Sequence, residues 1–247
     1  AASRGELAEA PTPAERACRN HTRDAEAWFL LGAIHGGMGE WSDAVRCCKR
    51  SVELAPDVAM THFNLGVAQL RMGNHAAAEM SLRKAVALAP ASAPAYAELG
   101  NVLQSAGKIR EAVTSYRRAQ EIQPQGGAVR FNLAKALSAL GESDAAIAEC
   151  QQAIATEPGL HEARMLLAGF LATRGDLDAA SEHFRAVTEM SPSNFDAWLG
   201  LAIALRDLAR TEEAETAARR ACELRADSND AHNVLGTILR SNGRLQE

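Results

Sequence analysis

The chain of 247 residues is poor in aromatic side chains, which make up 4% of it, and it has no long apolar run. A helix needs about 20 consecutive apolar residues to cross a bilayer, and the segment AASRGELAEAPTPAERA lacks the basic start and apolar centre of a secretion signal. Binders of nucleic acid usually show a basic surface and often stacking rings. The net charge of this chain is −5. We therefore expect no nucleic acid as partner, and the missing apolar segments predict an unsecreted chain with no membrane partner.

Cysteine pairs and catalytic motifs are also missing. The cysteines are five in number, Cys18, Cys47, Cys48, Cys150 and Cys222. Their number is odd, and they lack the short paired spacings of zinc or redox sites. They favour a reducing, cytoplasmic compartment, and abundant Ala and Arg suggest a bacterial source. The sequence contains no GxGxxG, GxxxxGK[ST], HExxH or GxSxG motif. We therefore expect this chain to have no catalytic residue, no metal site and no cofactor.

What the sequence does contain is a repeat of 34 residues. One small residue recurs as Gly32, Gly66, Gly100, Ala134, Ala168, Ala202 and Gly236. A second recurs as Ala44, Ala78, Ala112, Ala146, Ala180 and Ala214, and a third as Ser51, Ala85, Ala119, Ala153, Val187 and Ala221. Central glycines fall at Gly39, Gly73, Gly107, Gly141, Gly175 and Gly243, with Ala209 as the exception. Prolines close the copies at Pro56, Pro90, Pro124, Pro158 and Pro192, with Ala226 as the exception.

Each repeating position has a physical reason. Apolar residues at i, i+3, i+4 and i+7 on both sides of Gly107 predict two amphipathic helices, over about 93–106 and 110–122. Glycine takes a positive φ at low cost, so it ends the first helix and reverses the chain, and proline ends the second. Two helices joined by so short a turn pack antiparallel, and close packing requires small residues at the contact. The small residues Gly100 and Ala112 are expected to provide that contact.

The order Tyr, Leu-Gly, Ala, Tyr, Ala, Pro in AYAELGNVLQSAGKIREAVTSYRRAQEIQP resembles the tetratricopeptide repeat (TPR), and the copies AWFLLGAIHGGMGEWSDAVRCCKRSVELAP and HFNLGVAQLRMGNHAAAEMSLRKAVALAP repeat it. The resemblance implies an all-α, right-handed superhelical solenoid of antiparallel helix pairs. Six complete copies are expected, over 25–58, 59–92, 93–126, 127–160, 161–194 and 195–228. The sixth copy lacks both the central glycine and the closing proline, and it should be the loosest. Slots that the family fills with large apolar or aromatic side chains here hold His35, Cys48, Cys150 and Ala218.

Both ends cut through a repeat. Residues 1–24 resemble the tail of a preceding copy, and residues 229–247 the first helix of a seventh, truncated one. Leu235, Ile238 and Leu239 would then form an apolar face without its partner helix. Solenoids usually end in polar capping units. We therefore expect either a longer parent protein or self-association through residues 229–242.

Family resemblance further implies that a protein or peptide binds in the concave groove lined by the first helix of each copy. The expected groove residues are Phe29, Phe63, Asn64, Asn101, Phe131, Asn132, Lys135 and Met165. Carboxamides can donate to and accept from a peptide backbone while the apolar groups hold its side chains. Two alternatives stay open: the rings could instead pack between copies, and the asparagines could be structural.

Two ligands of related solenoids can be compared with these slots. The clamp that holds the acidic tail of heat-shock chaperones needs three cations. The best frame here offers Asn101 and Asn132 without any cation and adds Glu162, which repels carboxylates. That tail is therefore rejected. The asparagine ladder of the O-linked N-acetylglucosamine transferase solenoid is matched in part, by Asn64 and Asn132. This leaves a second hypothesis, in which the chain is the substrate-recruiting arm of a larger glycosyltransferase- or sulfotransferase-like enzyme.

A periodic stripe of cations on the second helices could suggest nucleic acid: Lys49-Arg50, Arg83-Lys84, Arg117-Arg118, Arg185 and Arg219-Arg220. Glutamates follow four residues after a base, as in exposed helices with side-chain ion pairs. We interpret the stripe as a solvated outer face rather than a binding surface.

Overall fold

The computed structural model describes residues 23–241, and every regular element in that range is an α-helix. The chain divides into two compact units, residues 1–124 and 125–247. The first unit contains α2 (Ala25–Met38), α3 (Trp41–Leu54), α4 (Ala59–Arg71), α5 (His75–Leu88), α6 (Ala93–Ser105) and α7 (Ile109–Ile122). The second contains α8 (Gly127–Ala139), α9 (Ser143–Thr156), α10 (His161–Thr173), α11 (Leu177–Met190), α12 (Phe195–Asp207), α13 (Thr211–Leu224) and α14 (Asn229–Ser241).

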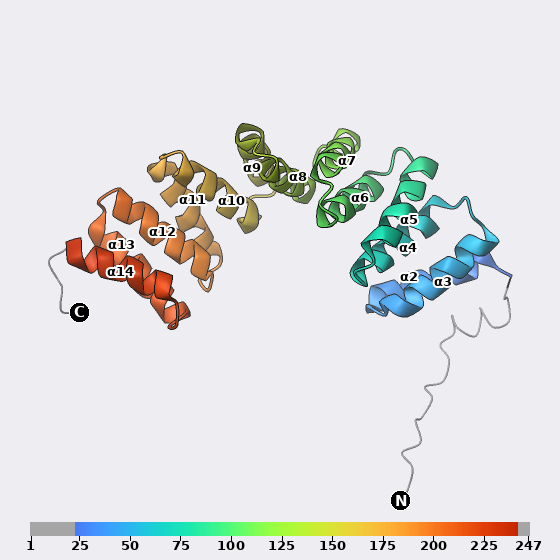
Figure 1. The fold of residues 1–247 in the computed structure, drawn as a ribbon, viewed down its shortest axis with the longest axis horizontal. Coiled ribbons are helices and arrows are strands. Elements are labelled where there is room, and N and C mark those ends of the chain that lie inside the picture. The colour runs from blue at the N-terminus through green and yellow to red at the C-terminus, as the bar shows by residue number, and fades with distance from the viewer. Residues whose placement is uncertain (1–22, 242–247) are drawn as a thin grey trace, which may run out of the picture. The chain divides into compact units, whose positions relative to one another are not determined.

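Within each unit the helices form hairpins that stack in sequence order (Figure 1). In the first unit α2 packs on α3, α4 on α5 and α6 on α7, while α3 meets α4 and α5 meets α6. In the second unit α8 to α13 form three further hairpins in the same way, and α14 packs on α13 and α12. Each unit is thus an all-α stack of helix pairs, in which a hairpin touches only its neighbours. The helices expected over 93–106 and 110–122 are confirmed as α6 and α7.

The turns inside the hairpins require a left-handed residue. All five central glycines of the described residues have φ between 75° and 82°: Gly39, Gly73, Gly107, Gly141 and Gly175. Two backbone hydrogen bonds hold the turn at Gly107. Gly107 N–H donates to the carbonyl of Gln104 at 3.0 Å, and Lys108 N–H donates to the carbonyl of Leu103 at 2.8 Å. Ala209 adopts the same turn with φ 57° although it carries a side chain. The sixth copy therefore keeps the hairpin at the cost of backbone strain.

Small residues lie where the two helices of a hairpin cross. Ala112 and Ala119 are buried, and a Cβ added to Gly100 would lie 2.5 Å from Cε1 of Tyr116. At Gly66 the equivalent Cβ would lie 2.6 Å from Cγ of Leu82. The close-packing role predicted for these positions is confirmed, and the large residue on the second helix sets how small its partner on the first helix must be.

A second recurring device fixes the start of the first helices. A side-chain N–H group about one turn into the helix meets the main-chain carbonyl six residues earlier, at the position of the closing proline. The nitrogen-to-oxygen distances are 2.8 Å for His62 with Pro56, 3.0 Å for Trp198 with Pro192 and 2.9 Å for His232 with Ala226. The histidines in this register thus hold the link between consecutive copies.

The last helix, α14, differs from expectation in the exposure of its apolar residues. Ile238 and Leu239 are buried, Val234 joins them, and only Leu235 is half-exposed. The exposed apolar face expected on the last helix is therefore wrong for two of its three residues, because α14 turns them onto α12 and α13. Residues 1–22 of the expected partial copy, and the central Gly243, lie outside the described residues.

Candidate functional site

All eight groove residues expected from the sequence lie on first helices, and none is buried. The first unit carries four of them, on α2, α4 and α6: Phe29, Phe63, Asn64 and Asn101. The second carries the other four, on α8 and α10: Phe131, Asn132, Lys135 and Met165. Phe63 lines a surface depression of the first unit, and Phe131, Lys135 and Met165 come together in a depression of the second. The other four line neither of these depressions: Phe29, Asn64, Asn101 and Asn132.

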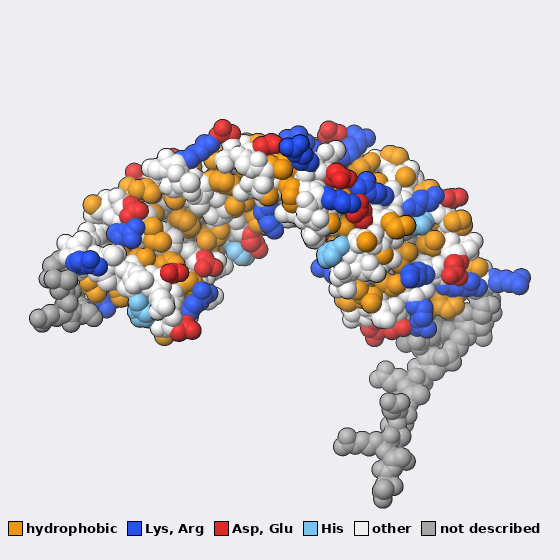
Figure 2. All heavy atoms as spheres, in the orientation of Figure 1, with side chains coloured by type: hydrophobic (Ala, Val, Ile, Leu, Met, Phe, Trp, Pro, Cys, Tyr) orange, Lys and Arg blue, Asp and Glu red, His pale blue; other side chains and the backbone are white. Residues whose placement is uncertain are grey.

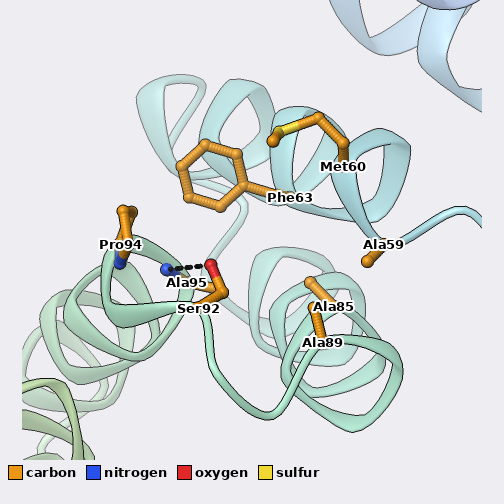
Figure 3. Close-up of a pocket in the computed structure, with 8 residues that line it drawn as sticks. All are labelled: Ala59, Met60, Phe63, Ala85, Ala89, Ser92, Pro94 and Ala95. Atoms are coloured by element: carbon orange, nitrogen blue, oxygen red, sulfur yellow. Dashed lines mark hydrogen bonds between the residues drawn. The ribbon is translucent and has the colours of Figure 1, made fainter. Parts of the chain in front are cut away.

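The depression of the first unit is built around Phe63 and has a volume of about 170 Å³. Figure 3 shows the Phe63 ring and Met60 on α4 on one side of the depression, the residues Ser92 to Ala95 at the start of α6 on another, and Ala85 of α5 with Ala89 just after that helix on a third. The lining residues are Ala59, Met60, Phe63, Ala85, Ala89, Ser92, Pro94 and Ala95. Met60 is 56% exposed, so a large apolar side chain stands at the rim. We call this depression the Phe63 pocket.

The walls of the Phe63 pocket are apolar apart from one hydroxyl. That hydroxyl belongs to Ser92, which precedes α6 and accepts the N–H of Ala95 at 3.4 Å, so it serves as a helix cap. An apolar side chain entering the pocket would leave water for walls that are apolar apart from this one hydroxyl. Such burial contributes about 1.5–3 kcal/mol. The pocket is therefore suited to an apolar side chain.

The depression of the second unit has a volume of about 470 Å³ and is more polar. It is lined by Phe131, Lys135, His161, Glu162, Met165, Leu166, Asn194 and Asp196. The ammonium of Lys135 lies 5.4 Å from the centre of the Phe131 ring, within the range of a cation–π contact. Three residues expected in the groove thus share one depression, which offers apolar surface beside charges of both signs.

The asparagines differ in how far their carboxamides are occupied. Asn101 donates to Glu98 Oε2 at 3.1 Å, and its Oδ1 accepts the hydroxyl of Tyr116 at 2.8 Å. Asn132 also has a partner within the chain. Asn64 has none among the residues that the structure describes. Asn101 is therefore a structural residue as well as a groove candidate, and Asn64 is the asparagine whose hydrogen-bonding groups are available to a ligand.

One slot of the asparagine ladder is closed by packing. Gly200 occupies the position that Asn64 and Asn132 hold in their copies, and a Cβ there would lie 2.6 Å from Cε1 of Phe184. An asparagine at this position would have to displace the buried Phe184 ring. The groove of the second unit therefore cannot continue the ladder through α12 with its present core.

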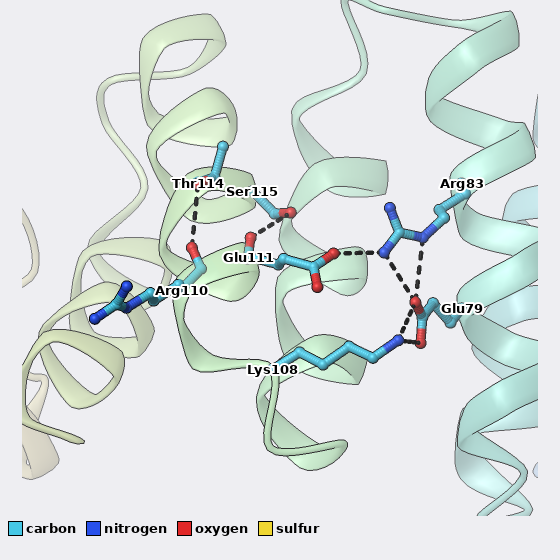
Figure 4. Close-up of polar contacts among 7 residues, drawn as sticks. All are labelled: Glu79, Arg83, Lys108, Arg110, Glu111, Thr114 and Ser115. Carbon is cyan, nitrogen blue, oxygen red and sulfur yellow. Dashed lines mark hydrogen bonds and ion pairs between the residues drawn. The ribbon is translucent and has the colours of Figure 1, made fainter. Parts of the chain in front are cut away.

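Ion pairs join neighbouring second helices. In Figure 4, Glu79 and Arg83 on α5 face Lys108 and Glu111 at the start of α7. Lys108 Nζ lies 2.7 Å from Glu79 Oε1, and Arg83 bridges Glu79 at 2.9 Å and Glu111 at 2.6 Å. Hydrogen bonds from Lys108 and then Arg83 lower the pKa of the Glu79 carboxyl. The bonds to Glu111 and Glu79 raise the pKa of the Arg83 guanidinium in turn.

Most cations of the periodic stripe are paired in this way. Pairs within one helix are three residues apart for Arg50 with Glu53, Arg118 with Glu121 and Arg220 with Glu223. The sequence had suggested that these glutamates pair with the base four residues before them, and in these three pairs the base is three residues before. Arg83 and Arg219 instead pair with a glutamate four residues earlier, Glu79 and Glu215. On the face drawn in Figure 2, acidic and basic side chains lie near one another in both units. This supports a solvated, ion-paired face.

Several titratable side chains outside the depressions are buried thiols or are already paired with a neighbour. Burial raises the pKa of the Cys48 and Cys150 thiols to about 12, so neither is a nucleophile near neutral pH. Ligand atoms of His35, Glu40 and Asp43 lie within 4.8 Å of one another, an arrangement that the sequence did not suggest. His35 Nδ1 already meets the Glu40 carboxylate, and Asp43 holds a guanidinium of its own helix.

The sequence analysis did not name Met60, Pro94 or Asp196 as lining residues, and it considered Glu162 only as a charge that repels an acidic tail. Met60 and Pro94, and Glu162 with Asp196 in the second unit, hold the same place near the start of their first helices, three residues before the expected apolar slot. The 34-residue register was the signal that could have found them. None of the helices in the described range has the length and apolar character needed to cross a membrane.

Three comparisons with known proteins relate this geometry to a family. Models described as tetratricopeptide repeat match residues 23–91, residues 103–170, and residues 171–231 together with 199–247. No curated protein sequence matches the chain significantly.

Solved structures match throughout most of the chain. YrrB, a TPR protein with an unusual peptide-binding site, is 24% identical with a TM-score of 0.66, covering 75% of this chain and 96% of YrrB. MamA is 25% identical with a TM-score of 0.62, covering 66% and 95%. PilF of Pseudomonas aeruginosa is 17% identical with a TM-score of 0.74, covering 89% and 99%. These structures share the fold of the chain, and the family models that match along it show that the chain belongs to the tetratricopeptide-repeat family.

Proposed function

We propose that the chain is a non-catalytic interaction module that binds an extended peptide, or an extended segment of a partner protein, along the first helices of its repeats. The fold by itself supports a protein-interaction scaffold in general. The observation that carries the finer proposal is the Phe63 pocket, a depression beside the first helices α4 and α6 whose walls are apolar apart from the hydroxyl of Ser92. YrrB, a protein of the same fold, has a peptide-binding site.

The second depression supports the same function with different chemistry. Lys135 can attract a carbonyl or carboxylate of the ligand, while Glu162 and Asp196 favour its cationic groups. Phe131 and Met165 supply apolar surface between these charges. A ligand with mixed charges and apolar residues fits this surface, whereas a tail rich in carboxylates would meet two like charges.

Self-association through residues 229–242 stays a prediction with less support than the sequence gave it. Ile238 and Leu239 are buried, and the exposed residues of α14 are largely polar, including His232, Asn233 and Arg240. Interfaces that hold permanent oligomers are usually more apolar than this.

The test starts from a library of random linear peptides displayed on phage and selected on the purified chain. Affinities of a selected, fluorescently labelled peptide are then measured by anisotropy for the wild type, Phe63→Ala and Phe131→Ala. Burial of one apolar side chain contributes about 1.5–3 kcal/mol to the binding free energy, so its loss weakens binding about 10-fold or more. Met80→Ala is the matched control, because Met80 is an apolar side chain that is 75% exposed on the second helix α5. Enrichment of no peptide, or equal affinities for all variants, would contradict the proposal.

A further inference from the structure

A third depression lies between α2, α3 and α4 in the first unit, with a volume of about 220 Å³. Its wall is formed by Trp41 at the start of α3 and by Val67 and Asn64 on α4. The floor is backbone and small side chains, because the facing residues of α2 include two consecutive glycines, Gly36 and Gly37. We call this depression the Trp41 site.

The two glycines are not explained by the fold. Neither has a positive φ, in contrast to Gly39 in the following turn. A Cβ at Gly36 would approach only Trp41, at 3.9 Å, and a Cβ at Gly37 would meet nothing within 4 Å. Gly32, by comparison, is required, because its Cβ would lie 2.7 Å from Cys48 Sγ. Glycine weakens a helix relative to alanine, so α2 carries two weakening residues that neither packing nor turn geometry needs.

Two polar groups of the Trp41 site have no partner among the described residues. The indole N–H of Trp41 makes no hydrogen bond there, and the Arg71 guanidinium lies 6.0 Å from the centre of its ring. The carboxamide of Asn64 is likewise unpaired within that range. Trp198, by contrast, donates its indole N–H to the main-chain carbonyl of Pro192 at 3.0 Å. The Trp41 site therefore offers one donor and one group that both donates and accepts.

We propose that the Trp41 site binds the main chain of an extended peptide and places one apolar side chain of that peptide against the Trp41 ring. The glycines let the peptide backbone approach α2 closely. Trp41 donates to a peptide carbonyl, and Asn64 pairs with a peptide amide through both of its groups. The inference rests on the proposed peptide-binding function but concerns a place distinct from the Phe63 pocket, with different lining residues.

The test uses a defined probe, the capped tripeptide acetyl-Ala-Leu-Ala-amide, titrated to millimolar concentration into the 15N-labelled full chain. We expect saturable shifts of the Trp41 indole N–H, identified by its loss in Trp41→Phe, and of the Asn64 side-chain amide. A probe with Asp in place of Leu should leave both signals unshifted. Gly36→Ala should abolish the shifts while raising Tm, since it strengthens α2 and fills the floor beside the ring.

The control variant is Gly169→Ala on α10, another helical glycine whose Cβ would meet nothing within 4 Å. It should raise Tm in the same way and leave the Trp41 and Asn64 shifts intact. Unchanged shifts in Gly36→Ala would overturn the Trp41 site. So would shifts at Phe63 and Ala95 without any at Trp41, an outcome that leaves the proposed function standing. Absence of shifts everywhere sinks the site, and the peptide-library selection then decides the proposed function separately.

Discussion

The phenol ring of Tyr116 occupies the space in which Gly100 would carry a side chain. A Cβ on Gly100 would lie 2.5 Å from Cε1 and 2.6 Å from Cδ1 of that ring, and Tyr116 is 1% exposed. The ring is also held at its hydroxyl, 2.8 Å from Asn101 Oδ1 and 3.0 Å from Gln104 Oε1. It can therefore not retreat without losing a buried hydrogen bond.

Gly100→Ala is accordingly expected to destabilise the chain although alanine favours helix. Overpacking of this kind costs about 1–3 kcal/mol, which exceeds the gain of about 1 kcal/mol from helix propensity. Urea denaturation followed by circular dichroism measures the difference. Gly169→Ala, with open space at its Cβ, should be more stable than the wild type in the same measurement. Equal effects of the two substitutions would show that the ring can move aside.

At Ala209 the opposite substitution, from alanine to glycine, is expected to stabilise the chain. Its φ of 57° is a conformation that costs a residue with a side chain about 1–2 kcal/mol. Ala209→Gly should therefore stabilise the chain by about 0.5–1 kcal/mol after the added entropy of the unfolded state is subtracted. Ala148→Gly, at an exposed position inside α9, should destabilise it by about 1 kcal/mol. A thermal melt of both variants checks the sign, and a lower Tm for Ala209→Gly would contradict the strain argument.

How far the sequence could predict this molecule depends on the range of the interactions. Hairpins, turn glycines and the small residues at Gly100 and Ala112 follow from a local pattern repeated along the chain, so they were predictable. The partner of Asn101 was not, because Tyr116 reaches it from the other helix of the hairpin. The sequence shows that position 200 departs from the asparagine ladder, but not the reason, which is the Phe184 ring of the preceding copy.

Glu79 is expected to make stability depend on acid pH. The bonds from Lys108 and Arg83 lower its pKa below the ordinary value of 4.5. A carboxyl with a lowered pKa in the folded state contributes stability above its unfolded pKa, and that contribution is lost as the pH falls through the folded pKa. Glu79→Gln should cost about 0.5–1 kcal/mol at pH 7, and the deficit should shrink as the pH drops below about 4.5.

Urea titrations of the wild type and Glu79→Gln at pH 7 and in acid measure this change. Glu121→Gln is the matched control, since Glu121 pairs only with Arg118 of its own helix and its side chain is 63% exposed. Its deficit should be small at both pH values. A Glu79→Gln deficit that does not change with pH would mean that the network contributes through packing rather than charge.

Asn64 and Asn101 should respond in opposite ways to truncation, because one carboxamide is unpaired in the described chain and the other is built into the hairpin. Asn101→Ala removes an acceptor from the Tyr116 hydroxyl, which keeps Gln104 as a second one, so a loss of about 0.5–1.5 kcal/mol in stability is expected. Asn64→Ala should change stability by less than about 0.5 kcal/mol and instead weaken binding of a peptide selected on the chain. Urea denaturation and anisotropy on the same two variants separate the effects. If Asn101→Ala alone weakened binding while the fold kept its stability, the ligand would compete with Tyr116 for that carboxamide, and the path of the peptide would have to run over α6 instead of past Trp41.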